Sequence, residues 1–399
     1  MRPDLEGPTS IFAVFFIQFL VGICLFFSLL YSVTELTFFA LLIHTMGLVA
    51  YFWSRVSLNH VNCTITLNRK KLFPGGKLKI DIRIDNSKLL PALFKVNLLA
   101  PGAITGSGSD QWISEEISLL WFQQFVFSRQ FFPDKRGVYN LGPPLLRVGD
   151  AFGFYLRKKE VKDRSEIIVY PRIVDIRPVN IPDRDFFGIP GALSPVEDPI
   201  FVFGTRDYQP GRPARRIHWK VSARQNRLQE KLCEPAEQKK LLILLEVDQF
   251  EQEQALEDFE RSLEVIVSLA LQMNRLGIAV GFATNGHIPG GGSNISPISR
   301  NSEQVDLIFE SLARIEPKTV DSLTGILSRS YHFPWGVSCI CFAYKHCGQS
   351  GATRALLMQR NVPLQFAFAK KSTDSNVKDG LRAEDIVYLD EIRVQENKK

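Results

Sequence analysis

Leu241-Leu242-Ile243-Leu244-Leu245 is an unbroken apolar run, and it decides the fold of the C-terminal part of the chain. A strand with one exposed face alternates apolar and polar residues, whereas this run has no polar position. Such strands are buried on both faces, as in a mostly parallel sheet that helices cover. The run therefore predicts an α/β domain, which we place at residues 237–399.

The residues after this run alternate between helix and strand patterns. Apolar residues spaced by three and four predict an amphipathic helix over residues 256–273, which ends at Gly277. Asn301 and Gln304 are placed like a capping box, at the start of a second helix. This alternation predicts an open, doubly wound sheet. The remaining predicted elements are strands over residues 278–283, 336–342 and 363–368 and a helix over residues 352–360.

Residues 57–173 have the pattern of antiparallel β structure instead. Lys79-Ile80-Asp81-Ile82-Arg83-Ile84 alternates apolar and polar residues, and Asp85-Asn86-Ser87 then supplies turn residues. Similar strand patterns recur at residues 65–67, 93–98 and 125–131. Short strands at this spacing are typical of a β-sandwich-like module of roughly one hundred residues.

Residues 1–56 contain two long apolar runs, over residues 11–31 and 36–53. The first is long enough to cross a bilayer, and the second is slightly shorter. Because only residues 32–35 separate them, they predict a two-helix transmembrane hairpin. Arg55, Arg69, Lys70 and Lys71 follow the second run, so the positive-inside rule places both termini in the cytoplasm. We expect a multi-pass protein of the inner membrane with most of the chain in the cytoplasm, and we interpret His44 as a packed residue.

Composition narrows the function classes. The 399 residues carry a net charge of +6, which is too small and too dispersed to indicate nucleic-acid binding by itself. Six cysteines are scattered without a Cys-x-x-Cys pair, which favours reduced thiols over disulfides or a zinc site. No P-loop or dinucleotide-binding fingerprint is present in the sequence.

Residues 174–236 are expected to be a linker that contains an arginine-rich segment, residues 204–224. This segment combines many arginines with a Tyr, a His and a Trp, so it is too basic for a core and too aromatic for a disordered tail. Three interpretations remain open. The arginines hold the linker against both domains with Trp219 buried; or they form a docking surface with Trp219; or they bind a polyanion such as nucleic acid or anionic lipid.

Three motifs resemble the bacterial family known as domain of unknown function fifty-eight. They are Asp134 to Pro143, Gly149-Asp150-Ala151-Phe152-Gly153-Phe154, and the run from Arg206 to Arg224. The resemblance implies a membrane anchor, a β-rich module, and a C-terminal domain similar to von Willebrand factor type A domains. It also implies a MoxR-type AAA+ ATPase as partner, and it implies no enzymatic activity. The candidate interaction residues are Arg206, Asp207, Tyr208, Arg215, Arg216, His218, Trp219, Lys220 and Arg224.

The same resemblance raises the question of a magnesium site. Type A domains often bind this ion through Asp-x-Ser-x-Ser after the first strand, and Mg²⁺ requires oxygen ligands. The corresponding residues here are Glu246, Asp248 and Phe250. Two carboxylates can contribute oxygens but Phe250 cannot, so the site is degenerate. Glu246 and Asp248 are expected to be solvated acids at a strand end, with magnesium the one candidate cofactor.

The function that we expect is a non-enzymatic, membrane-anchored scaffold that works with an AAA+ ATPase in the assembly or maturation of a client. One alternative is a hydrolase or transferase centred on His218, because Ser222 lies one helical turn away. The other is polyanion or nucleic-acid binding through the arginine-rich segment. Nucleic acids and small-molecule substrates are not the partners that we expect.

Overall fold

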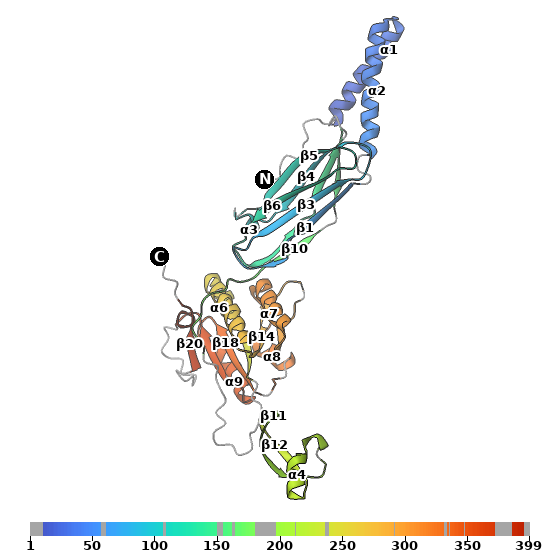
Figure 1. The fold of residues 1–399 in the computed structure, drawn as a ribbon. Helices are drawn as coiled ribbons and strands as arrows, with labels where there is room; N and C mark the ends of the chain where they lie inside the picture. The colour runs from blue at the N-terminus through green and yellow to red at the C-terminus, as the bar shows by residue number, and fades with distance from the viewer. Residues whose placement is uncertain are drawn as a thin grey trace. The chain divides into compact units, whose positions relative to one another are not determined.

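The structure is a computed structural model, and it divides into two compact units, Met1–Pro171 and Arg172–Lys399 (Figure 1). The described residues are 11–56, 61–106, 109–149, 155–161, 164–179, 197–211, 213–235, 239–290, 292–330, 333–334, 336–346, 348–371 and 385–394. Part of one predicted motif, residues 150–154, and part of the predicted linker, residues 180–196, lie outside them.

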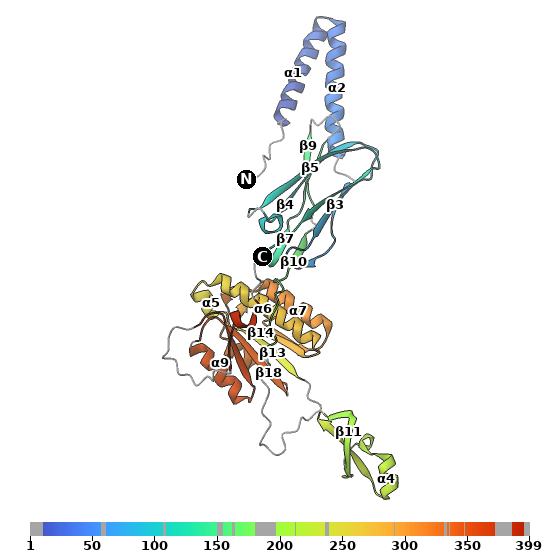
Figure 2. The ribbon, with the colours of Figure 1, turned by 60° about the vertical axis from the view of Figure 1, so that its left-hand side comes forward.

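The first unit begins with two apolar helices, α1 (Ile11–Leu30) and α2 (Thr34–Val56), which lie side by side (Figure 2). The chain reverses direction at Ser32, whose φ is +57°, and the Ser28 hydroxyl hydrogen-bonds to the Val33 carbonyl. By length and composition α2 can cross a membrane, whereas the apolar part of α1, Val14–Leu30, is shorter. The described chain therefore has one candidate membrane helix near its N-terminus.

The rest of this unit consists of ten strands and one short helix among the described residues. Their bounds are β1 (Val61–Leu67), β2 (Lys71–Leu72), β3 (Leu78–Asn86), β4 (Ala92–Ala100), α3 (Gly102–Thr105), β5 (Gln111–Leu119), β6 (Gln124–Phe131), β7 (Gly137–Leu141), β8 (Leu145–Gly149), β9 (Leu156–Glu160) and β10 (Ser165–Val169). Antiparallel pairs build the sheets β1-β3-β6 and β5-β4-β8-β9. A third sheet, β2-β10-β7, combines a parallel pair with an antiparallel one.

One apolar core connects these sheets. Ile80, Ile82 and Ile84 of β3 face it together with Phe94 and Leu98 of β4. The residues between the three isoleucines are less buried, so the alternation predicted for this strand is confirmed. β6 differs, because most of its side chains are exposed at the edge of its sheet.

The second unit contains a six-stranded sheet in the order β16-β14-β13-β18-β19-β20. β14 and β16 pair antiparallel and the other neighbours pair in parallel, so the sheet is open and mostly parallel, as predicted. The bounds are β13 (Lys240–Leu245), β14 (Ala279–Thr284), β16 (Ile295–Ser299), β18 (Val337–Ala343), β19 (Leu364–Phe368) and β20 (Ile386–Tyr388). A small ribbon pairs β15 (Gly286–His287) with β17 (Glu316–Thr319).

Helices cover the sheet, and β13 is buried from Leu241 to Leu245 as its sequence predicts. α6 and α7 pack against β14, and α9 packs against β19. Residues of α8 and α9 share a core with Leu242 and Leu244. The helix bounds are α5 (Asp248–Gln252), α6 (Leu256–Arg275), α7 (Ser302–Arg314), α8 (Leu323–Ser330), α9 (Gly348–Gln359) and α10 (Leu389–Ile392).

One local prediction needs correction. Asn301 caps α7 by accepting a hydrogen bond from the Glu303 backbone N–H, but Gln304 donates to the Pro297 carbonyl and so completes no capping box.

The predicted linker, residues 174–236, contains ordered elements. Ile176 pairs with Arg393, and residues 197–207 form β11 (Glu197–Asp207), whose backbone groups pair with a neighbouring strand.

Candidate functional site

The arginine-rich segment lies within a small arm, residues 197–235, of the second unit. β11 pairs antiparallel with β12 (Gln229–Pro235), and between them lie a 3₁₀ turn, Ala214–Arg216, and helix α4 (Trp219–Gln225). Gly211 adopts a φ of +98°, which suits the turn after β11, and Asn226 ends α4 with a φ of +52°. The segment is therefore an ordered element, as predicted.

Hydrogen bonds attach α4 to β12. The Ser222 hydroxyl donates to the His218 carbonyl and accepts from the Gln229 backbone N–H at 2.9 Å. The His218 backbone N–H donates to the Gln229 carbonyl at 2.7 Å, and His218 Nδ1 accepts from the Val221 N–H at the start of the helix. The side chains of Ser222 and His218 thus both bond to the backbone of the arm. These two residues, which were considered as a nucleophile and its base, have a structural role here.

Two acids of the arm neutralise part of its positive charge. Arg206 and Glu230 face each other across the ribbon, and Arg206 Nε donates to the Glu230 carboxylate. Glu230 is 1% exposed, so this ion pair is shielded on the side of the acid. Asp207 accepts from the Gln229 side chain and from Arg227 Nη1. Arg206 and Asp207 therefore hold the ribbon together.

In α4 and the turn before it, large side chains are exposed to solvent. Trp219 is 66% exposed, and Arg215, Lys220 and Arg224 are exposed as well. Trp219 is therefore not buried within the arm. Its neighbour Ile217 is buried instead, because it faces β12 opposite Glu230.

The nine candidate interaction residues thus separate into two groups within one arm. An inner group supports the ribbon and the helix start, and an outer group consists of an exposed indole and cations close to it in the sequence. Arg216 and Tyr208 are half-buried between them, and the Tyr208 N–H donates to the Leu228 carbonyl. The inner group, defined by its hydrogen bonds within the arm, is Arg206, Asp207 and His218, although Arg206 and Asp207 are also exposed. The outer group is Arg215, Trp219, Lys220 and Arg224, which are all exposed.

The candidate metal residues lie elsewhere, after β13 at the carboxyl edge of the sheet. Glu246 is 4% exposed, and burial, with a smaller effect of nearby Asp248, raises its pKa to about 7. Asp248 accepts a hydrogen bond from the Asn285 amide, whose oxygen accepts from the Val247 N–H at 2.8 Å. The expectation that both acids are solvated is wrong for Glu246, because the layers of the domain enclose it.

This edge fits a magnesium ion poorly. Phe250 is fully buried, and its ring packs against Phe259 and Tyr344, so it occupies apolar space where a hydroxyl ligand would be required. Asp248 already serves Asn285 as an acceptor. No group of three or more His, Cys, Asp or Glu side chains gathers into a possible metal site in the part of the chain that the structure describes.

Asn285 is a site residue that sequence reasoning missed. Thr284 is the last residue of β14 and Asn285 follows it directly, and both are buried. Polar residues at the end of a parallel strand are a usable signal, since such strand ends converge at one edge of the sheet. Their partners come from the end of β13: the Thr284 hydroxyl donates to the Leu245 carbonyl.

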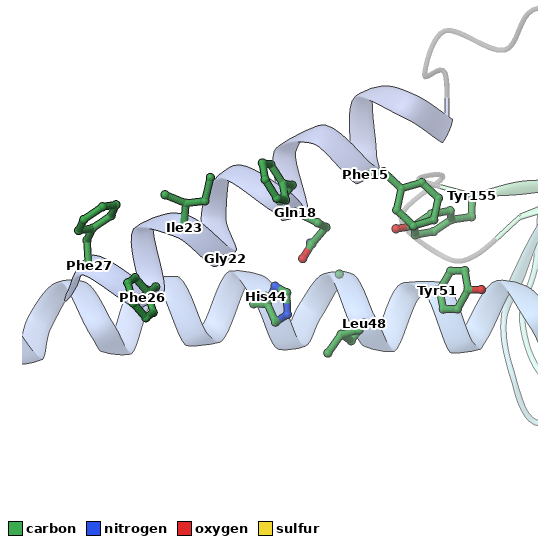
Figure 3. Close-up of a pocket in the computed structure, with 12 residues that line it drawn as sticks. Phe15, Gln18, Gly22, Ile23, Phe26, Phe27, His44, Leu48, Tyr51 and Tyr155 are labelled. Carbon is green, nitrogen blue, oxygen red and sulfur yellow. The ribbon is translucent and has the colours of Figure 1, made fainter. Parts of the chain in front are cut away.

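A third candidate place is an open cavity of about 900 Å³ between α1 and α2 (Figure 3). Its lining is mostly apolar, but Gln18 and His44 face it as well. Among the described residues, His44 Nδ1 and Gln18 Oε1 are buried and have no hydrogen-bond partner. His44 is half-buried and lines the cavity, and whether it has a structural or a functional role stays a prediction.

Comparison with known proteins points to one family. Residues 204–328 match the family described as protein of unknown function DUF58. The match contains the arginine-rich segment and the first half of the sheet domain, which confirms the predicted resemblance there. A relative, the uncharacterized protein YeaD of Bacillus subtilis, is 23% identical over 251 residues, which are 62% of this chain and 60% of YeaD. The chain thus matches less than two thirds of the length of that relative.

Two solved structures align only weakly with this chain. The CARDB domain of the PF1109 protein from Pyrococcus furiosus aligns at a TM-score of 0.18 and 10% identity, covering 27% of this chain and 91% of that domain. The β-glucosidase EmGH1 from Erythrobacter marinus aligns at a TM-score of 0.18 and 13% identity, covering 27% and 15%. Scores this low do not establish a common fold.

Proposed function

We propose that this chain is a membrane-anchored interaction protein that docks a protein partner through the outer group of the arm. The observation that carries the proposal is the exposure of Trp219 on a helix that internal hydrogen bonds hold in place. An exposed indole on an ordered element loses little conformational entropy on binding. Trp and Arg are also the residues that most often dominate the free energy of protein–protein association.

The charge around Trp219 supports a partner with an acidic surface. Arg215, Lys220 and Arg224 are exposed near it in the sequence, and the acids Asp207 and Glu230 are occupied by contacts inside the arm. Complementary charge at the rim of an interface raises the association rate and selects the partner. The resemblance to the DUF58 family leads us to propose a MoxR-type AAA+ ATPase as this partner.

The remaining parts of the proposal concern the anchor and the sheet domain. The apolar α2, paired with α1, supports a two-helix membrane hairpin. Arg55 and the following cations support an inner-membrane, multi-pass protein with its bulk in the cytoplasm. The sheet order, with its one antiparallel edge pair, supports a von Willebrand factor type A-like domain. In this proposal the domain is a scaffold and carries no catalysis.

Affinity purification of the full chain in detergent, followed by mass spectrometry, tests the docking surface. We expect an AAA+ ATPase to be recovered with the wild-type chain and to be reduced at least about tenfold by Trp219→Ala. The double variant Arg215→Ala/Arg216→Ala should also reduce recovery. The matched control is Leu276→Ala, which removes an equally exposed apolar side chain, 66% in both cases, from the sheet domain.

Three outcomes would contradict the proposal. Recovery of no stable partner speaks against docking, and undiminished recovery with Trp219→Ala speaks against this surface. Binding to oligonucleotides that weakens steeply with salt would favour the polyanion alternative, since phosphate contacts release counterions.

A further inference from the structure

Two short loops at one end of the β module expose large apolar side chains. The loops are residues 87–91, between β3 and β4, and residues 120–123, between β5 and β6; we call them the apolar loop pair. Leu89, Leu120, Trp121 and Phe122 are between 46% and 73% exposed. Scattered exposed apolar residues are ordinary, but four within two adjacent loops form a patch that marks an interaction surface.

The patch is an ordered structure. Asn86, which is buried, donates from its side chain to the carbonyls of Leu90 and Leu120, one in each loop. The Phe122 N–H donates to the Lys88 carbonyl at 3.2 Å, which joins the loops directly. Phe122 has a φ of +53°, a conformation that is strained for an aromatic residue. Such strain persists only where the surroundings impose it, and it is often connected with function.

The apolar loop pair lies at the end of the β module that adjoins α2. Asn86 pairs with Val61, the first residue of β1 after α2, and Trp53 Nε1 of α2 donates to the Pro91 carbonyl at 2.9 Å. Tyr155, which precedes β9, inserts between the two helices (Figure 3). Its ring centroid lies 6.2 Å from that of Phe15 and 5.6 Å from that of Tyr51.

Positive charge accompanies the apolar patch. Arg55 lies over the Tyr51 ring at 5.3 Å, and Arg157 Nε lies 3.5 Å from the Ser54 hydroxyl. Lys159 Nζ donates to the Val61 carbonyl. Burial, with a smaller effect of Lys159, lowers the pKa of Lys88 to about 8. Asp85 is an acid at the same end of β3, and the cations outnumber it.

We propose that the apolar loop pair is a second membrane contact, which inserts into the headgroup region of the bilayer beside α2. The inference rests on the proposed membrane anchor and adds to it a surface and a ligand class, phospholipid. Aromatic and aliphatic side chains with flanking cations are the composition of membrane-interface anchors. Trp53 holds the loop of residues 87–91 next to the end of the candidate membrane helix, so the loops reach the bilayer when α2 spans it.

Site-specific photocrosslinking of the full chain in its own membranes tests this proposal. Benzoylphenylalanine is introduced at one position per chain: at Phe122 in the patch, at Leu42 in the exposed apolar face of α2, and at Lys77. Lys77 is exposed and precedes β3 at the opposite end of that strand, so it serves as the matched control. We expect phospholipid adducts at positions 42 and 122 with comparable yield, and only background at position 77.

The three positions separate the possible failures. Lipid adducts at position 42 with background at position 122 overturn the membrane contact and leave the anchor intact. Background at both positions overturns the anchor and the contact together. Protein adducts in place of lipid at position 122 show that the patch binds another protein. The variant Leu89→Ser/Trp121→Ser/Phe122→Ser should fold as the wild type does, and it should abolish lipid adducts from benzoylphenylalanine placed at Leu120 while those at position 42 persist.

Discussion

The arm and the carboxyl edge of the sheet use similar residue types for opposite purposes. Each region combines acidic side chains with a large aromatic one. At the sheet edge, Glu246 and Phe250 are buried beneath the helices of the domain. In the arm, Trp219 is exposed and the acids pair with arginines or amides. The difference shows that the number of packed layers, more than residue type, decides which aromatic residue supports the fold and which is available to a partner.

The largest expected change in the free energy of unfolding comes from removing the buried ring of Phe250 at the carboxyl edge of the sheet. Phe250→Ala leaves a cavity against Phe259 and Tyr344, so it should lower the free energy of unfolding by about 3–5 kcal/mol. Chemical denaturation of the full chain in detergent, followed by circular dichroism, measures this change. Phe132→Ala is the matched control, because that ring is exposed and its loss should cost little. Equal effects of the two variants would contradict the burial of Phe250.

The next largest effect is the pH dependence that Glu246 gives to the free energy of unfolding. Its pKa is about 7 in the folded protein and 4.5 ordinarily, so the folded state holds one more proton between these values. The free energy of unfolding should therefore fall as pH rises from about 4.5 to 7, by about 3 kcal/mol from this group. Glu246→Gln should remove that dependence and stabilise the protein at pH 8. Parallel wild-type and variant curves from pH 4 to 8 would show that Glu246 titrates normally.

A smaller effect is expected within the arm from Glu230→Gln. The change removes the charge that Arg206 pairs with, but Arg206 is partly exposed and water replaces the lost partner. Local opening of the ribbon should become easier by about 1–2 kcal/mol. Amide hydrogen exchange in β12 and α4 measures it, with β13 as the internal reference. Faster exchange in β13 as well would mean that the arm and the sheet unfold as one unit.

The smallest effect on stability is expected for Trp219→Ala. An exposed surface side chain contributes little to folding, so the free energy of unfolding should change by no more than about 0.5 kcal/mol. The same variant should lose partner recovery, which separates a docking role from a structural one. A loss of 2 kcal/mol or more in denaturation would instead show that Trp219 supports the fold.

Much of the architecture was predictable from local patterns. The continuous apolar run at residues 241–245 predicted a fully buried strand, and the alternation around Ile80 and Ile82 predicted a strand with one buried face. These predictions succeed because burial on one face or both imposes a period on the sequence itself. The antiparallel strand β16 and the short strand β20 were not predicted. Neither contains a run of apolar residues, or of alternating apolar and polar residues, that is long enough to indicate a strand.

The candidate sites were predictable only in part. Composition identified the arginine-rich segment as an ordered surface element, and the resemblance directed attention to Glu246 and Asp248. The pairing of Asp248 with Asn285 connects residues far apart in the chain, and no local pattern contains it. The apolar loop pair was likewise missed, because the sequence shows that Trp121 and Phe122 are apolar but not whether they are covered.

The sequence by itself determined the apolar α2, the strand-rich module and the α/β domain, because each depends on hydrophobic periodicity along a short segment. Tertiary structure decided the burial of Glu246, the exposure of Trp219 and the meeting of two loops beside the end of α2. These depend on which elements cover a residue, and that is set by packing between segments distant in sequence.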